Sequence, residues 1–497
     1  MARFGSRLGS LRLEHLWPAT VLTLIFALTA AMPVAQADFW WHVTVGEQIA
    51  ATRSIPALDT FTHTQAGDPY PSYQQFWLMD LVLYWLHALG GPVLVSVVHA
   101  LTLTTTYALV LWVAWRASHS WRAAAIATLL AAILGFFNWN IRPQTAAFLL
   151  GALLLAGITA QRSSASGRWV ALFPLVMVVW ANAHGTFPIG LALLGLWVLD
   201  ELVTQARAIR AGEAGPATGL TRAALALLLS LLATFVSPAG PGWLRYVGAM
   251  AGNEAVQGVS EWLPPDPTEA QGASFFAVLL LMVFVLIRSP RRPTLVELVT
   301  FLAFAALGIR YGRGSVWLGI VAAPVIAAHL AALGARFRPA QPAAPSRTES
   351  RFALGGLVVL TLAALVAAAP AREALTGRQV IASDTPVEST AFLLAAQPPG
   401  PIFNSQVFGS YLIWAAQPDY PVFIDSRVEL FPDAVWEDYA AISAARWDWQ
   451  ARLDRYGVRT LFLSPEYAEH LIEAATASPA WVEIYRDDVA VILTQSP

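Results

Sequence analysis

The residues best suited to chemistry form a short segment near the N-terminus. Asp38-Phe39-Trp40-Trp41-His42 directly follows the first long apolar stretch, so a carboxylate, two indoles and an imidazole stand at the mouth of a predicted membrane span. Ionisable groups at such a place are costly unless they serve a function. A carboxylate partly shielded from water by Trp40 and Trp41 would hold a proton more tightly and could act as a general base. Asp38 is therefore the leading catalytic candidate.

Each residue of this segment also has a structural explanation. Asp38 suits the N-cap of a short helix that runs from Phe39 to Ala51. Trp40 and Trp41 fit either an interfacial anchor or a platform for a sugar ring, because tryptophans gather at membrane interfaces in any case. His42 follows Asp38 by one helical turn, so the two side chains either share a site or form a capping pair. The sequence leaves these alternatives open.

Asp59 and His63 repeat the same spacing later in the polar segment. Because Asp59-Thr60-Phe61-Thr62 has the composition of a turn, we expect Asp59 to fix that turn rather than to bind a ligand. Two Asp/His pairs in one loop could still hold a divalent cation, since carboxylates and imidazoles are both metal ligands. Nothing in the sequence requires a cofactor. If one is bound, these residues would suit a divalent cation.

Further candidates for substrate binding stand at the outer ends of predicted spans. Arg310 and Arg313 could bind a lipid phosphate through the arginine fork, or reach lipid headgroups only as anchors. Arg142 is a similar candidate. His184 ends a span and could reach the same cavity, although polar residues at helix ends are ordinary. Glu261, in a later outer loop, could supply a second acid or be a solvated loop residue.

The elements that must position these residues are mostly membrane spans. Of the 497 residues, 57% are hydrophobic and only 12% are charged, far from the composition of a soluble domain. Runs of about 20 apolar residues can cross a bilayer. We predict about eleven spans, at residues 16–37, 92–115, 121–137, 144–160, 169–183, 186–204, 222–237, 272–288, 294–308, 314–334 and 352–370. Residues 1–370 are therefore predicted to form a polytopic α-helical membrane domain.

The arginines set the predicted orientation. With the N-terminus inside, most arginines in the loops are cytoplasmic, as the positive-inside rule requires. The same distribution favours one crossing rather than two between residues 76 and 115. Residues 76–89 then form an amphipathic helix on the outer interface, within a first outer loop at 38–91. In that helix we expect Asp80, Tyr84 and His87 to face water.

Residues 371–497 have ordinary polarity and are predicted to form a small extracytoplasmic α/β domain. Buried strands are expected at 401–404, 421–425, 459–463 and 488–493, with helices between them. Asp425 and Arg427 are expected to pair within the domain or to face the membrane portion, and Gly409 to permit a tight turn from strand to helix. Residues 335–351, rich in Pro, Ala and Arg, predict an inner linker.

Several short motifs resemble those of bacterial GT-C-type membrane glycosyltransferases and their uncharacterised relatives. In the first outer loop they are Asp38-Phe39-Trp40-Trp41-His42, Asp59-Thr60-Phe61-Thr62 and Trp77-Leu78. Arg142-Pro143-Gln144, the stretch from Trp180 to Gly185, Glu261-Trp262, Asn404 to Tyr411 and Ile424 to Arg427 fit the same pattern. One departure is Phe76, which stands where the resemblance leads us to expect a glutamate.

The resemblance implies transfer of a sugar from a polyprenyl-phosphate-linked donor to an extracytoplasmic acceptor of unknown kind, with Asp38 as the catalytic acid that is carried over. It also implies the plasma membrane of a bacterium, with the lipid bilayer and the donor as partners. The missing glutamate puts schemes with two carboxylates or an assisting metal in doubt.

Other classes of protein remain to be weighed against a transferase. A non-enzymatic scaffold or envelope-assembly protein is the alternative, since Asp38 and the outer arginines could be structural. A transporter is disfavoured because the predicted spans are almost free of charge. The net charge of −2 gives no indication of a nucleic-acid partner, and the absence of cysteine excludes disulfides and thiolate catalysis.

Overall fold

The structure is a computed structural model that describes residues 11–35, 37–164, 166–213, 215–244, 248, 262–336, 347–368, 373 and 380–496. The described chain is mostly helical, with a small sheet near its C-terminal end, which confirms the predicted class of fold. It divides into two compact units. The helical unit comprises Met1–Met32, Ser96–Pro241 and Gln257–Arg378. The mixed unit comprises Pro33–Val95, Gly242–Val256 and Gln379–Pro497.

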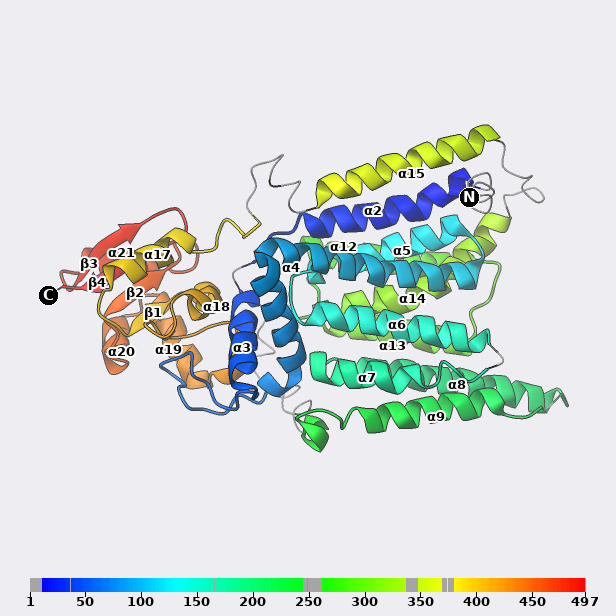
Figure 1. Ribbon diagram of the computed structural model, residues 1–497, viewed down its shortest axis with the longest axis horizontal. Helices are drawn as coiled ribbons and strands as arrows, with labels where there is room; N and C mark the ends of the chain where they lie inside the picture. The colour runs from blue at the N-terminus through cyan, green and yellow to red at the C-terminus, as the bar shows by residue number, and fades with distance from the viewer. Residues whose placement is uncertain are drawn as a thin grey trace. The chain divides into compact units, whose positions relative to one another are not determined.

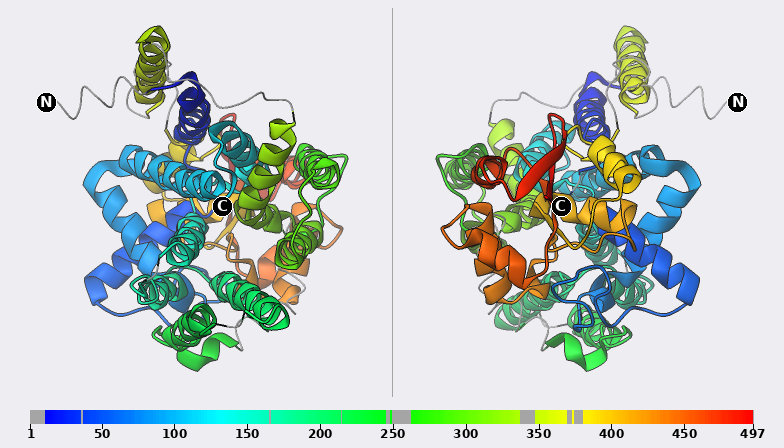
Figure 2. Two further views of the ribbon diagram at one scale, coloured as in Figure 1. Left: turned by 90° about the vertical axis from the view of Figure 1, so that its right-hand side faces the viewer. Right: turned by 90° about the vertical axis from the view of Figure 1, so that its left-hand side faces the viewer.

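Long apolar helices that lie side by side form the helical unit (Figure 1; Figure 2 shows them end-on). They are α2 (Leu16–Ala30), the second part of α4 (Tyr73–Ser118), α5 (Trp121–Gly135), α6 (Gln144–Arg162), α7 (Leu172–Ala183), α8 (Pro188–Arg210), α9 (Thr218–Ala233), α12 (Ala270–Arg288), α13 (Leu295–Arg310), α14 (Ser315–Ala335) and α15 (Arg347–Ala367). Each predicted span coincides with one of these helices.

Not every helix of the helical unit is long and apolar enough to count as a membrane span. Within the described residues, eight helices are long and apolar enough to cross a membrane. Two other helices of the helical unit, α7 and α9, are apolar but shorter. The predicted total of eleven crossings is therefore not confirmed and stays a prediction.

Helix α14 forms the core of the helical unit. The ring of Trp317 stacks on that of Trp180 with 5.6 Å between centroids, and a Cβ added at Gly151 would lie 2.7 Å from Trp317. At Gly319 an added Cβ would lie 2.8 Å from the carbonyl oxygen of Ala131 in α5. Small residues at these places let helices approach closely, which is how membrane helices gain packing energy.

The mixed unit combines the first outer loop with the C-terminal part of the chain. The loop supplies α3 (Phe39–Thr52) and the first part of α4, which is interrupted by non-helical backbone at Gly90 and Gly91. The C-terminal part supplies, in chain order, α17 (Val387–Ala396), β1 (Ile402–Asn404), α18 (Gln406–Ala415), α19 (Asp433–Ser443), α20 (Trp449–Arg455), β2 (Thr460–Leu463), α21 (Glu469–Ala477), β3 (Trp481–Arg486) and β4 (Val491–Gln495).

The sheet of the mixed unit has the strand order β1-β2-β4-β3, with β1 and β2 parallel and the other pairs antiparallel. Three predicted strands appear in it as β1, β2 and β4. The fourth prediction, at residues 421–425, is wrong, because this buried segment does not join the sheet. Its backbone binds the first outer loop instead: Val422 N–H donates to the Phe61 carbonyl and His63 N–H donates to the Val422 carbonyl, both at 3.0 Å.

Two glycines let backbones approach each other within the mixed unit. A Cβ at Gly46 in α3 would lie 2.1 Å from the carbonyl oxygen of Asp80 in α4. A Cβ at Gly409 would lie 2.4 Å from the carbonyl oxygen of Ile424. Gly409 sits inside α18 rather than at a turn, so our expectation of a turn glycine was wrong. Its role is to admit the segment that carries Asp425 and Arg427.

Candidate functional site

Asp38 occupies the N-cap position of α3, but its side chain makes no capping hydrogen bond there. The backbone N–H of Trp41, the third residue of the helix, instead donates to the Ser410 Oγ at 3.0 Å. On the other side of Asp38, the Ser426 Oγ donates to the carbonyl of Ala37 at 2.9 Å. Two serines of the C-terminal part therefore fix the backbone that carries Asp38. The capping role that we considered for Asp38 is filled by Ser410.

Trp40 and Trp41 are both buried inside the mixed unit, at 0% and 4% exposure. The ring of Trp40 lies 4.6 Å from that of Trp414 and 5.8 Å from that of His87. The ring of Trp41 stacks on His42 with 3.6 Å between centroids. The two indoles therefore pack the N-terminal turn of α3 against its neighbours and present no broad face to solvent.

His42 pairs with Asp80, a residue that we expected to face water. The His42 Nδ1 lies 2.6 Å from the Asp80 Oδ1, and the two side chains are 5% and 0% exposed. The expectation for Asp80 was wrong because α3 covers that face of α4, a close approach that Gly46 permits. The sequence signal that could have found this pair is the combination of an acid in α4 with a histidine and a glycine one turn apart in α3.

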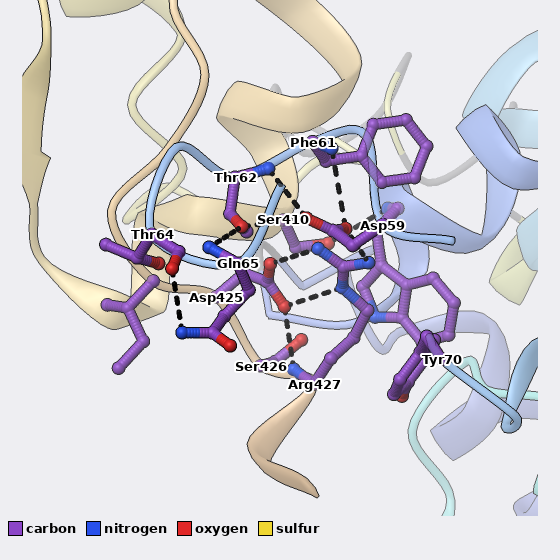
Figure 3. A network of polar contacts seen from close by, with 12 residues as sticks. Asp59, Phe61, Thr62, Thr64, Gln65, Tyr70, Ser410, Asp425, Ser426 and Arg427 are labelled. Carbon is purple, nitrogen blue, oxygen red and sulfur yellow. Dashed lines mark hydrogen bonds and ion pairs between the residues drawn. The ribbon is translucent and has the colours of Figure 1, made fainter. Parts of the chain in front are cut away.

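A buried arginine joins the first outer loop to the C-terminal part of the mixed unit (Figure 3). Arg427 Nη1 donates to Asp59 Oδ1 and to the Tyr73 hydroxyl, both at 2.7 Å. Its Nε and Nη2 donate to the two carboxylate oxygens of Asp425 at 2.9 and 2.6 Å. The charged side chains of Arg427, Asp59 and Asp425 are 0% exposed. Asp425 and Arg427 pair with each other, as one of the two expectations had it, and Arg427 also binds Asp59 and Tyr73 of the first outer loop.

Electrostatics keep Arg427 charged despite its burial. Burial by itself lowers the pKa of Arg427, but the neighbouring Asp425, Tyr73 and Asp59 raise it well above its ordinary value. Asp59 Oδ2 also accepts hydrogen bonds from the Thr62 N–H and hydroxyl, at 3.0 and 2.7 Å. Asp59 thus fixes the turn, as predicted, and compensates the arginine as well.

His63 is held by the C-terminal part of the unit. Its Nε2–H donates to the Ile402 carbonyl at 2.9 Å. Burial lowers the pKa of His63, and this hydrogen bond offsets the shift only in part. Among the described residues, no group of three or more His, Asp or Glu side chains could hold a metal ion.

The candidates in the helical unit gather where several helices begin or end. Arg313 Nη2 donates to the Oε1 of Gln144 at 2.8 Å, and Gln144 follows Arg142 by two residues. The guanidinium of Arg313 lies 5.0 Å from the ring centroid of Trp262. Arg310 ends α13 and lies 4.6 Å from the centroid of its neighbour Tyr311.

His184 and Glu261 complete the set of candidates in the helical unit. His184 follows α7, and its Nδ1 accepts the backbone N–H of Thr186 at 3.1 Å. Glu261 lies outside the described residues.

The fold has clear relatives among solved structures. The oligosaccharyltransferase AglB from Archaeoglobus fulgidus and a second structure of an oligosaccharyltransferase from that organism match 97% of this chain and 74% of their own, with TM-scores of 0.53 and 0.54 at 11% and 12% identity. The arabinofuranosyltransferase AftD from mycobacteria matches 96% of this chain and 41% of its own, with a TM-score of 0.54 at 14% identity. The chain has a GT-C-type fold. The shared fold confirms the resemblance that the sequence motifs indicated. Together with the apolar helices, it indicates a multi-pass membrane protein.

Sequence comparison alone does not reach this result. No protein-family model and no curated protein matches the chain. At identities of 11–14% the likeness to these structures concerns the fold alone. It assigns no role to any residue of the candidate site.

The capping geometry gives a prediction for stability. Ser410→Ala removes the acceptor of the Trp41 N–H and should lower the free energy of unfolding by about 1 kcal/mol. In an Asp38→Ala background the loss should be larger, because no side chain at the N-cap can then take over the bond. The measurement is a double-mutant cycle on the purified protein, from the free energies of unfolding in denaturant. Equal losses in the two backgrounds would show that Asp38 cannot replace Ser410.

The buried arginine gives a second prediction. Arg427→Met should destabilise the protein by about 3–5 kcal/mol, because two carboxylates stay buried without their cation. Arg427→Lys should rescue little, since one ammonium cannot reproduce the fork. Arg452→Met is the matched control: it also removes an arginine that binds two carboxylates, Asp438 and Asp448, but on a partly exposed face. Thermal unfolding compares the three variants, and a similar loss for Arg452→Met would contradict the special role of Arg427.

Proposed function

We propose that this protein transfers a sugar from a polyprenyl-phosphate-linked donor to an extracytoplasmic acceptor. The observation that carries the proposal is the fold likeness to AglB over 97% of the chain. The AglB structure holds a dolichol-phosphate and an inhibitory peptide, and the second oligosaccharyltransferase structure from Archaeoglobus fulgidus is tethered to an acceptor peptide. A lipid phosphate and an acceptor on one enzyme of this fold support the same pairing here. The nature of the sugar and of the acceptor stays open.

In the proposed reaction Asp38 is the general base. Its carboxylate takes the proton of the acceptor hydroxyl while that oxygen attacks the anomeric carbon of the sugar. The bond from this carbon to the phosphate oxygen breaks, and the lipid phosphate leaves with the electron pair. One feature of the mixed unit supports this role: Asp38 is only partly buried, so an acceptor hydroxyl can approach its carboxylate.

The other candidates divide into two proposed roles. Trp40, Trp41, His42, Asp59 and His63 are buried or bonded within the mixed unit, and we assign them to the positioning of the Asp38 segment.

A second group would meet the donor. Arg310, Arg313 and Arg142 are assigned to the lipid phosphate, since guanidinium forks match phosphate geometry. Arg313 is already oriented by its bond to Gln144. His184 is assigned to the same polar end of the helical unit.

Asp38→Asn tests the proposal most directly. Asn preserves the size of the side chain but cannot take a proton, so transfer should fall by about 10²–10⁴-fold, while the melting temperature should stay near that of the wild type. Transfer is measured with purified protein and a panel of radiolabelled undecaprenyl-phosphate sugars. Asp68→Asn, an exposed carboxylate of the same loop, is the matched control and should leave the rate unchanged.

Two outcomes would contradict this account. Wild-type activity in a folded Asp38→Asn protein would remove Asp38 from the mechanism. Failure of the wild type to use any of the donors, together with undiminished function in the cell for Asp38→Asn, would favour a non-enzymatic scaffold in envelope assembly.

We also propose the predicted topology, with eleven crossings of a bacterial inner membrane, a cytoplasmic N-terminus and linker at 335–351, and residues 371–497 outside. Because the chain contains no cysteine, single cysteines can report it. Glu213→Cys, between α8 and α9, should resist an impermeant maleimide in spheroplasts, whereas Glu473→Cys in α21 should react. Both positions are exposed in the structure. The opposite pattern of labelling would invert the topology and place the acceptor on the cytoplasmic side.

A further inference from the structure

A cavity of about 430 Å³ lies in the helical unit, away from the candidate residues already described. It is lined by the C-terminal ends of α4 and α6, the middle of α8 and α14, and the N-terminal end of α13. Helix α6 begins at Gln144, beside Arg142, and reaches the cavity at Arg162. Helix α13 reaches the cavity at its start and ends at Arg310. The cavity therefore lies at the opposite ends of these helices from Arg142 and Arg310.

The walls of the cavity are largely hydrocarbon. Leu155 and Ile158 of α6, Leu193 and Leu196 of α8, and Val321 of α14 contribute to them. An apolar lining of this kind between membrane helices is a poor match for a purely water-soluble ligand. It suits an acyl chain, which gains free energy from contact with these side chains.

The rim of the cavity is charged, and its charges do not cancel. Arg162 pairs with Asp200 at 2.6 Å, and Arg291 pairs with Glu297 at 2.5 Å. A third arginine, Arg116, also lines the cavity.

Arg116 differs from the other two arginines in its partner. Its Nη2 donates to the hydroxyl of Ser163 at 2.7 Å rather than to a carboxylate. Three guanidinium groups against two carboxylates leave one positive charge at the rim. One uncompensated cation beside an apolar wall is complementary to an amphiphile that carries one negative charge.

We propose that this cavity binds an anionic phospholipid of the bilayer, with its phosphodiester at Arg116 and Ser163 and an acyl chain along the apolar wall. Arg116 supplies the charge-assisted hydrogen bonds. The pairs Arg162–Asp200 and Arg291–Glu297 hold the rim open in a fixed geometry. The site is independent of the proposed sugar transfer, because none of its residues belongs to the Asp38 segment or to the candidates at the other helix ends.

The structural consequence is a lipid that braces five helices at one end of the helical unit. Because a ligand that binds only the folded state stabilises it, occupancy should raise the melting temperature in proportion to lipid concentration and then saturate. In the proposed topology this end faces the cytoplasm, where juxtamembrane basic residues meet anionic headgroups.

The experiment uses the purified full-length protein in detergent, titrated with phosphatidylglycerol. We expect a saturable rise in melting temperature, no such rise with zwitterionic phosphatidylcholine, and none with soluble glycerol phosphate. Arg116→Gln should raise the apparent dissociation constant for phosphatidylglycerol by at least about tenfold. Arg207→Gln, which removes an exposed arginine of α8 that does not line the cavity, is the matched control and should respond like the wild type.

A second variant, Thr159→Phe, keeps the proposal testable if Arg116→Gln does not fold. Thr159→Phe adds a ring to the cavity wall and should block the lipid response without removing a charge. Equal stabilisation by phosphatidylcholine would mean a general bilayer effect, and stabilisation by glycerol phosphate would mean a soluble anion site. An undiminished response in both Arg116→Gln and Thr159→Phe would place the lipid elsewhere. Each of these three results would overturn the proposal.

Discussion

The buried guanidinium of Arg427 is the constraint on which the mixed unit depends. A cation at 0% exposure is tolerable only when carboxylates and hydrogen-bond acceptors surround it. Asp425 lies two residues away in the chain, but one neighbour does not use all five donors of the fork. The remaining partners, Asp59 and Tyr73, come from the first outer loop, more than 350 residues earlier. The charge of one side chain thus requires two distant parts of the chain to fold as one unit.

This requirement reaches Asp38 through backbone contacts. Asp59 fixes a turn, and the residues just after it exchange hydrogen bonds with the 421–425 segment. That segment leads into Ser426, which holds the carbonyl of Ala37, while Ser410 of α18 caps α3. The position of the proposed base is therefore set by the C-terminal part of the chain. Without that part, α3 would lose the acceptor for its third backbone N–H.

The arginines at the two polar ends of the helical unit have different kinds of partner. At one end Arg313 is oriented by an amide, Gln144. At the other end two of three arginines are already neutralised by Asp200 and Glu297. Between them lies the apolar core around α14, where glycine and tryptophan pack closely against each other.

The sequence by itself determined the class of fold, because long apolar runs in a bilayer have helices as their main solution. It also determined three of the strands and the turn at Asp59, which depend on neighbours close in the chain. Only the tertiary structure decided that Asp80 is buried against His42, that Trp40 and Trp41 are interior, and that residues 421–425 bind a loop rather than a sheet. Helical periodicity shows which side chains share a face, but whether water or another helix covers that face is settled by contacts between residues far apart in the sequence.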